Sequence, residues 1–185
     1  AAALSGTSTT PVVPRMPSVS VGVEIVISPF LATRLATNAT VPRAMLNAAV
    51  LCVEVDPHRI ERRLETRYLD EVADDIDDAF ARVQRHAAEG RGLSVGLLGN
   101  AGEVFPELYR RGVRFDLVTD QTSAHDMLNG YVPSGMALAA ALALRASDPD
   151  EYVRRARETA VRHVQAMLDL KDAGSHVFDY GNNLR

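Results

Sequence analysis

The fold of this chain is decided first by residues 49–57, AVLCVEVDP. Residues 49–55 form an apolar run that carries one carboxylate, Glu54, and a run of this length before a turn predicts a buried strand. Asp56 and Pro57 are typical of a helix N-cap and its first turn. The stretch therefore predicts a strand that leads directly into a helix, which we expect to continue to Arg67.

The pattern of strand followed by helix repeats downstream. Two more strands are predicted over residues 93–99 (LSVGLLG) and 115–119 (FDLVT). Apolar spacing and capping residues predict helices over residues 74–89, 101–111, 136–146 and 149–170. This alternation is typical of an α/β fold, and we expect a Rossmann-like parallel sheet with helices on both faces.

The two ends of the chain follow other patterns. Residues 1–20 are mainly Ser, Thr, Pro and Ala without periodicity, so we expect a disordered, flexible leader. Residues 21–27 predict a short strand and residues 172–185 a loop. We therefore expect a leader over residues 1–20 and a partial Rossmann-like domain over residues 21–185.

The composition excludes several classes of function. With 20 basic residues dispersed among 24 acidic ones, the chain offers no basic surface for nucleic acid. Its single cysteine cannot form an internal disulfide, and its longest apolar run is too short to cross a bilayer. We expect a cytoplasmic protein without nucleic-acid or membrane partners.

Two of the predicted strand ends carry candidate binding groups. Glu54 ends one strand, with Arg59 in the next helix, and an acid at this place can accept hydrogen bonds from a ribose. The alternative is an acid that caps the helix and pairs with a surface arginine. The turn at residues 99–102 (GNAG), with Asn100 and Ala101 at its centre, either admits a ligand or is a tight turn that needs glycine.

The loop after the third of these strands is the richest in polar side chains. Residues 119–133 (TDQTSAHDMLNGYVP) combine acids, amides, hydroxyls and an imidazole, and loops on rigid scaffolds commonly carry function. His125 is a candidate general acid or base that Asp120 or Asp126 would orient, or else an anchor of the loop. A hydrolase with Ser123 as nucleophile is disfavoured by the absence of a G-x-S-x-G pattern, and a metal site by the spacing of the histidines.

Several segments resemble one enzyme family, the urocanases. They are CVEVDPHRIERRLETRYLDE (residues 52–71), GLLGNAGEVFPELYRRGVRFDLVTDQTSAHD (96–126), HVQAMLDL (163–170) and the polar FDYGNN (178–183), whose alternative interpretation is an ordinary turn. The likeness covers residues from about 46 to 185. It implies the NAD-binding Rossmann-like domain of a urocanate hydratase, as a fragment.

The resemblance also implies a reaction and a set of contacts. The enzyme is a lyase of histidine degradation that uses NAD to add water to urocanate, giving imidazolonepropionate, and the family implies a homodimer. Residues at positions matching the family's cofactor contacts are Glu54, Arg59, Asn100, Ala101, Gln121, Thr122, Ser123, Ala124, His125, Tyr131, Val132 and Tyr180.

Two features depart from the family pattern. Residues 31–47 contain no glycine, whereas the family has a glycine-rich turn of the G-x-G-G-M-G-G kind before the strand-end acid. The family's catalytic cysteine, in a D-C-G-S segment, has no counterpart here, and Cys52 is expected to be a buried strand residue. The alternative to the enzyme is therefore a catalytically silent truncated or frameshifted fragment, at most a nucleotide-binding module. We expect this chain alone to lack urocanate hydratase activity.

Overall fold

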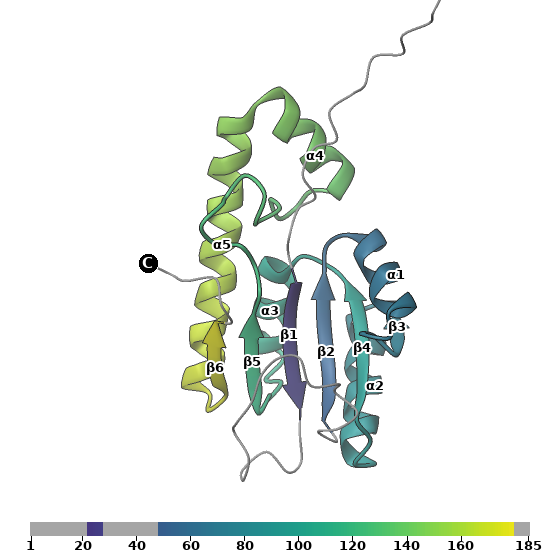
Figure 1. Cartoon of the computed structure of the whole chain (residues 1–185). Helices are drawn as coiled ribbons and strands as arrows, with labels where there is room; N and C mark the ends of the chain where they lie inside the picture. The colour runs from purple at the N-terminus through teal and green to yellow at the C-terminus, as the bar shows by residue number, and fades with distance from the viewer. Residues whose placement is uncertain (1–21, 28–47, 180–185) are drawn as a thin grey trace, which may run out of the picture.

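The computed structural model of the chain describes residues 22–27 and 48–179. Among these residues, one sheet has the strand order β3-β4-β2-β1-β5-β6 (Figure 1). Its strands are β1 (Gly22–Ile27), β2 (Ala49–Glu54), β3 (Glu71–Ala73), β4 (Leu93–Leu98), β5 (Leu117–Asp120) and β6 (His176–Asp179). The helices are α1 (Pro57–Glu65), α2 (Ile76–Ala88), α3 (Ala101–Arg110), α4 (Leu138–Ser147) and α5 (Pro149–Asp172). The leader predicted over residues 1–20 lies outside the described residues.

The predicted α/β fold is confirmed, with one difference in the sheet. Strands β3, β4 and β2 are parallel to one another, and so are β5 and β6. Strand β1 lies between β2 and β5 and is antiparallel to both. An antiparallel pair needs no crossover helix between its strands, whereas each parallel pair does. The sheet is therefore mixed at β1 rather than wholly parallel.

Two short strands were not expected from the sequence. Residues 176–179, within the predicted C-terminal loop, form β6 alongside β5, and residues 71–73 form β3 alongside β4. Strands of three or four residues are too short to show a periodic pattern, and their pairing with a longer neighbour stabilises them. The helix predicted to reach Arg67 ends at Glu65, because Arg67 takes the left-handed conformation with φ of 58°.

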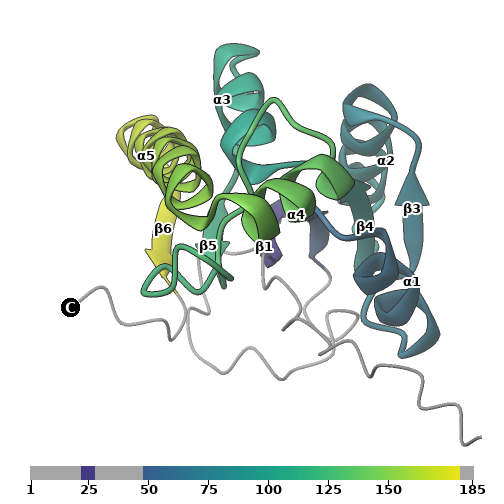
Figure 2. The ribbon, with the colours of Figure 1, turned by 90° about the horizontal axis from the view of Figure 1, so that it is seen from above.

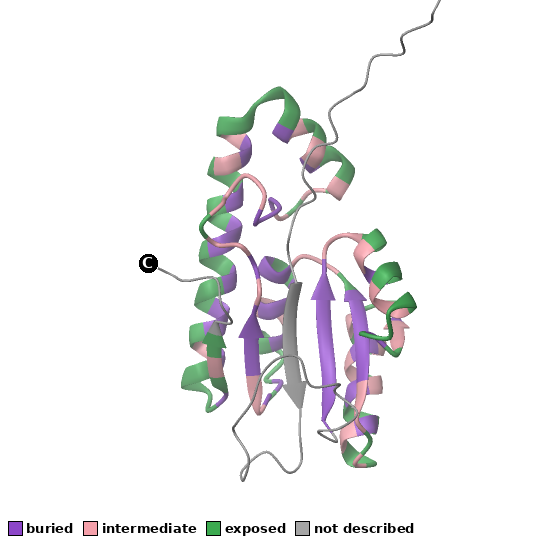
Figure 3. Ribbon diagram, in the orientation of Figure 1, coloured by how far each residue is buried: buried purple, intermediate pink, exposed green. Residues whose placement is uncertain are grey.

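Helices cover both faces of the sheet unequally (Figure 2). Helices α2, α3 and α5 lie on one face and α1 lies on the other. The main core forms between the sheet and helices α2, α3 and α5. Figure 3 shows buried residues on the central strands and on these helices. They include Val53, Val95, Phe105, Val118 and Leu170. Cys52, expected to be a core residue, is buried with Ile60 of α1 on the other face.

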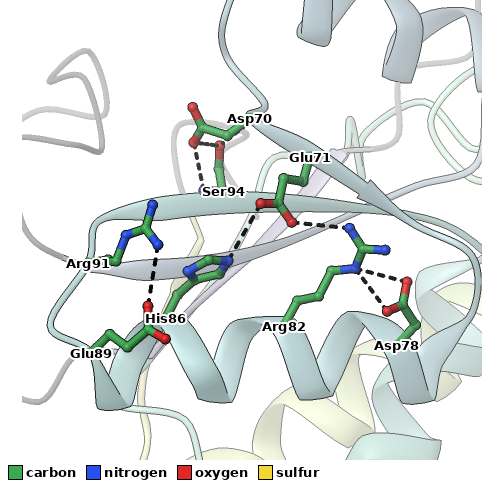
Figure 4. Close-up of polar contacts among 8 residues, drawn as sticks. All are labelled: Asp70, Glu71, Asp78, Arg82, His86, Glu89, Arg91 and Ser94. Carbon is green, nitrogen blue, oxygen red and sulfur yellow. Dashed lines mark hydrogen bonds and ion pairs between the residues drawn. The ribbon is translucent and has the colours of Figure 1, made fainter.

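Polar contacts join β3, at the edge of the sheet, to α2 and to β4 (Figure 4). Glu71 of β3 accepts a hydrogen bond from Nη1 of Arg82 at 3.1 Å, and Nε2 of the buried His86 lies 3.7 Å from the same carboxylate. Asp70 accepts hydrogen bonds from the backbone N–H and hydroxyl of Ser94 in β4. These contacts stabilise the short strand β3 at the edge, away from the strand ends that carry the candidate site.

Candidate functional site

The carboxyl ends of β2, β4 and β5 lie at one edge of the sheet. In the strand register Glu54 is opposite Leu98 of β4 and Gly22 of β1, and Asp120 of β5 is opposite Val23. Strands β2 and β5 thus run in the same direction with β1 between them, about 10 Å apart at two strand spacings. The prediction that the segments after these strands share one edge is confirmed.

Glu54 is a buried carboxylate at the end of β2. Its Oε1 accepts hydrogen bonds from the backbone N–H groups of Val55 at 3.0 Å and Asp56 at 3.3 Å. Its Oε2 lies 3.7 Å from Nη2 of Arg63 and has no hydrogen-bond partner within the described part of the chain. Burial raises the pKa of Glu54 to about 7, although the charges of Arg63 and Arg59 act in the opposite direction.

The alternative interpretation of Glu54, as an acid that caps the helix and pairs with a surface arginine, is wrong about the cap, although Glu54 does pair with Arg63. Asp56 is the N-cap of α1 and accepts a hydrogen bond from the backbone N–H of His58. Nε of Arg59 lies 4.0 Å from the carboxylate of Asp56, whereas Nη2 of Arg63 lies 3.7 Å from that of Glu54. Oε2 of Glu54, which lies beside Arg63, is therefore an acceptor that the start of α1 does not use.

Asn100 joins the start of α3 to the loop that follows β5. Its Oδ1 accepts a hydrogen bond from the backbone N–H of Gly102, which caps the helix, and its Nδ2 donates to the carbonyl of Val132 at 2.9 Å. A Cβ on Gly102 would lie 2.6 Å from Cγ2 of Thr159 in α5. Close packing of α3 on α5 therefore requires this glycine, whatever a ligand needs. Ala101 is buried in the main core.

Replacing Asn100 separates its two roles. Asn100→Asp keeps the oxygen that caps α3 but loses the donor to Val132, whereas Asn100→Ala loses both contacts. We expect Asn100→Ala to lower the free energy of unfolding by about 1–2 kcal/mol, and Asn100→Asp to lower it less. Urea denaturation of both variants measures the difference. Equal losses in the two would show that the cap contributes nothing.

Two carboxylates accept hydrogen bonds from residues of the segment from Gln121 to Val132, which we call the β5 loop. Oδ1 of the buried Asp120 accepts hydrogen bonds from the backbone N–H of Thr122 at 2.8 Å and from its hydroxyl at 2.6 Å. Asp126 accepts from the side chain and backbone of Asn129 and from the backbone N–H of Leu128. These hydrogen bonds lower the pKa of Asp126, and the one from the Asn129 side chain has the largest effect.

Gly130 lies in a tight part of this loop. Its N–H donates to the carbonyl of Asp126, and a Cβ on Gly130 would lie 2.6 Å from that same oxygen and closer still to the carbonyl oxygen of Ser123. Both obstacles are backbone atoms, which cannot rotate away. The loop therefore closes on itself at a point that only glycine permits.

A comparison with family models identifies this arrangement. The model described as the urocanase Rossmann-like domain matches residues 36–185. The chain belongs to the urocanase family. The strand-end acid and the polar β5 loop described above therefore lie in the Rossmann-like domain of a urocanase.

The urocanase domain brings some of the predicted contact residues together and keeps others apart. Asn100 and Val132 are hydrogen-bonded, whereas Glu54 lies beyond β1 from the β5 loop. Gln121, Ser123 and Ala124 are partly exposed, and His125 is exposed. The side chains of Thr122, Tyr131 and Val132 are buried, and Tyr180 lies outside the described residues. Of the predicted contact residues in this loop, those with side chains accessible to a ligand are therefore residues 121, 123, 124 and 125.

A hydrogen-bonded pairing of His125 with a neighbouring acid, considered as a catalytic arrangement, is not observed among the described residues, although the charge of His125 contributes to the lowered pKa of Asp126. The hydrogen bonds of Asp120 and Asp126 described above come from other loop residues, and none joins either carboxylate to His125 among the described residues. Instead His163 of α5 faces Asp120, with Nδ1 3.8 Å from Oδ2. Sequence reasoning missed His163 in this role, although it falls on the buried stripe of α5 with Tyr152, Ala156, Ala160 and Met167.

The described residues lack two further features. No group of three or more His, Cys, Asp or Glu side chains within them is arranged to hold a metal ion. No helix in the same part of the chain is long and apolar enough to cross a membrane.

Proposed function

We propose that this domain binds NAD and belongs to a urocanate hydratase, which adds water to urocanate to give imidazolonepropionate. The family match over residues 36–185 carries the proposal. When bound in such an enzyme, the oxidised nicotinamide supplies an electrophile toward the imidazole of the substrate, without net redox change. The residues of this domain would hold and orient the cofactor.

The chemistry of the strand end fits a dinucleotide. A Rossmann-like domain uses an acid at the end of its second strand to accept hydrogen bonds from the ribose hydroxyls of the adenosine. Glu54 ends β2 with Oε2 buried and without a hydrogen-bond partner among the described residues. Arg59 and Arg63 lie on the helix that follows, and their charges favour the ionised form that accepts such hydrogen bonds.

The polar side of the β5 loop would complete the cofactor site. The side chains of Gln121, Ser123 and His125 offer an amide, a hydroxyl and an imidazole on a loop that internal hydrogen bonds hold in one shape. Preorganised donors and acceptors bind a ligand with less loss of conformational entropy. We place the cofactor against this loop and the adenosine at Glu54.

A second candidate is a nucleotide-binding module without catalytic activity. Residues 31–47 contain no glycine, so the turn that usually lets a backbone approach a pyrophosphate has no counterpart in the sequence. Loss of several phosphate hydrogen bonds, at about 1 kcal/mol each, weakens binding by orders of magnitude. The affinity for NAD distinguishes a complete cofactor site from such a module.

Calorimetric titration of the purified chain with NAD and NADP tests the proposal. We expect NAD to bind with a dissociation constant of tens of micromolar or weaker, about −6 kcal/mol. NADP should bind at least tenfold more weakly, because its 2′-phosphate would meet the carboxylate of Glu54. Equal affinity for both dinucleotides, or no binding of millimolar NAD, would contradict the proposal. Submicromolar binding of NAD would support a complete cofactor site against the silent module.

A further inference from the structure

One side chain of α5 lies against both ends of the β5 loop. His163 is fully buried, and its Nδ1 is hydrogen-bonded to the hydroxyl of Tyr131 at 3.0 Å, near the end of the loop. The same nitrogen lies 3.8 Å from Oδ2 of Asp120, directly before the loop begins. One imidazole therefore links residues that are eleven positions apart and border the exposed part of the loop.

The surroundings of this imidazole fix its orientation. The ring of Phe105 from α3 packs edge-on against it with centroids 4.8 Å apart, and the ring of Tyr131 packs at 5.9 Å. The hydroxyl of Tyr152, also on α5, donates to the carbonyl of Tyr131 at 2.9 Å. Helix α5 thus holds Tyr131 by both its backbone and its side chain.

The imidazole is more than a space-filling group. Nε2 of His163 is buried without a hydrogen-bond partner among the described residues, and an unpaired buried polar atom is unfavourable. A phenyl ring would fill the same space without that penalty but would lose the contacts to Tyr131 and Asp120. The contacts of Nδ1 with Tyr131 and Asp120 therefore explain why a polar ring occupies this position.

We propose that His163 is a positioning residue, which keeps the β5 loop in the shape that receives the cofactor by linking Asp120 to Tyr131. Its effect on NAD rests on the proposed function, whereas its effect on the loop does not. Asp120 connects His163 to the first residues of the loop, because Oδ1 of Asp120 accepts hydrogen bonds from the backbone N–H and the hydroxyl of Thr122. Among the described residues, no hydrogen bond or ion pair joins His163 to the exposed side chains of the loop.

The linkage depends on the protonation state of the imidazole. Burial lowers the pKa of His163, and the charge of Asp120 opposes this effect only in part. The titratable groups that face it are Asp120 of β5 and Tyr131 of the loop, while α3 contributes the uncharged Phe105. A loop that opens exposes the imidazole to water and restores a pKa near 6.5. Acid therefore favours the open loop as the pH falls below that value.

Amide hydrogen exchange of the full chain tests the proposal without cofactor. The amides of Thr122, Ala124, Asp126 and Gly130 donate hydrogen bonds within the loop and report its closure. We expect His163→Phe to lower their protection factors at least tenfold, while the amides of β2 and β4 keep theirs. His163→Asn should retain most of the protection, because its amide can still bond to the Tyr131 hydroxyl. Unchanged loop protection in His163→Phe would overturn the proposal.

The pH profile separates positioning from packing. Protection of the loop in the wild-type chain should decrease between pH 7.5 and 5.5, whereas in His163→Asn it should stay constant. Tyr131→Phe, which removes one hydroxyl, should loosen the loop even where His163→Phe does not fold, and Tyr109→Phe on the exposed side of α3 is its control. A wild-type profile that matches His163→Asn, or a loop unaffected by Tyr131→Phe, would show that the imidazole only fills space.

Titration with NAD adds the link to function. We expect His163→Phe to raise the dissociation constant at least tenfold and His163→Asn to raise it less than threefold, measured at one pH because Glu54 also titrates near neutrality. If the wild-type chain binds no NAD, the proposed function fails and the exchange experiment still decides the role of His163. Loosened loops with unchanged affinity would overturn the connection to the cofactor.

Discussion

Substitution of Gly130 by alanine is expected to abolish measurable binding of NAD and to lower the free energy of unfolding by about 2–3 kcal/mol. The added methyl group would lie 2.6 Å from the carbonyl oxygen of Asp126 and closer still to that of Ser123. Because both are backbone atoms of the β5 loop, the loop has to open to admit the methyl group. Opening breaks the short hydrogen bond from the Gly130 N–H to Asp126.

Thermal denaturation and calorimetric titration together measure these effects. A matched control is Gly112→Ala, at the end of α3, where φ is +69° and nothing lies within 4 Å of an added Cβ. This control should destabilise the chain by about 1 kcal/mol through backbone strain alone and leave the affinity for NAD unchanged. Binding by Gly130→Ala within twofold of the wild-type chain would refute the role given to the closed loop.

Substitution of Glu54 by glutamine is expected to act in opposite directions on stability and on binding. Burial raises the pKa of Glu54 in the folded chain from 4.5 to about 7. The folded chain therefore keeps a proton that the unfolded chain releases, and stability is lost as the pH rises from 4.5 to 7. Glutamine does not titrate, so Glu54→Gln should be more stable than the wild-type chain above pH 7 by about 2–3 kcal/mol.

The same substitution should weaken the binding of NAD. A charged acceptor at the ribose contributes about 1.5–3 kcal/mol, so loss of its charge should raise the dissociation constant about tenfold to a hundredfold. Urea denaturation between pH 4.5 and 8.5 and titration at pH 8 measure the two effects. Glu61→Gln, an exposed position on α1, is the control and should change neither. If the free energy of unfolding changes with pH in the same way in Glu54→Gln and in the wild-type chain, the raised pKa of Glu54 would be contradicted.

Local patterns predicted most of the fold. The apolar runs at residues 49–55 and 93–99 became β2 and β4 within one residue of the expected bounds, and Asp56 and Asn100 cap the helices that follow. These features depend on neighbours within a few residues, so they can be recognised without the fold. The short strands β3 and β6 depend on partners far along the chain, and the sequence did not reveal them.

In the candidate site, too, the sequence predicted local features but not contacts between distant residues. The sequence placed an acid, an amide and a polar loop after successive strands, and the rule that parallel strands end at one edge brought them together. It could not show that Asp120 binds Thr122 and faces His163 rather than His125, because His163 comes from a helix 43 positions later. Nor could it show that Arg63, one helical turn beyond Arg59, lies 3.7 Å from the carboxylate of Glu54.

Local sequence patterns predicted the class of the fold and the positions of the main strands and helices, and the quoted segments predicted the family that the family match confirmed. The folded structure was needed to show which predicted site residues are exposed, such as His125, and which are buried, such as Tyr131. It also revealed that β1 runs antiparallel and that Gly102 serves the packing of α3 on α5. The physical reason is that strand and helix signals arise between near neighbours, whereas burial, ionisation and steric fit depend on segments that only folding brings into contact.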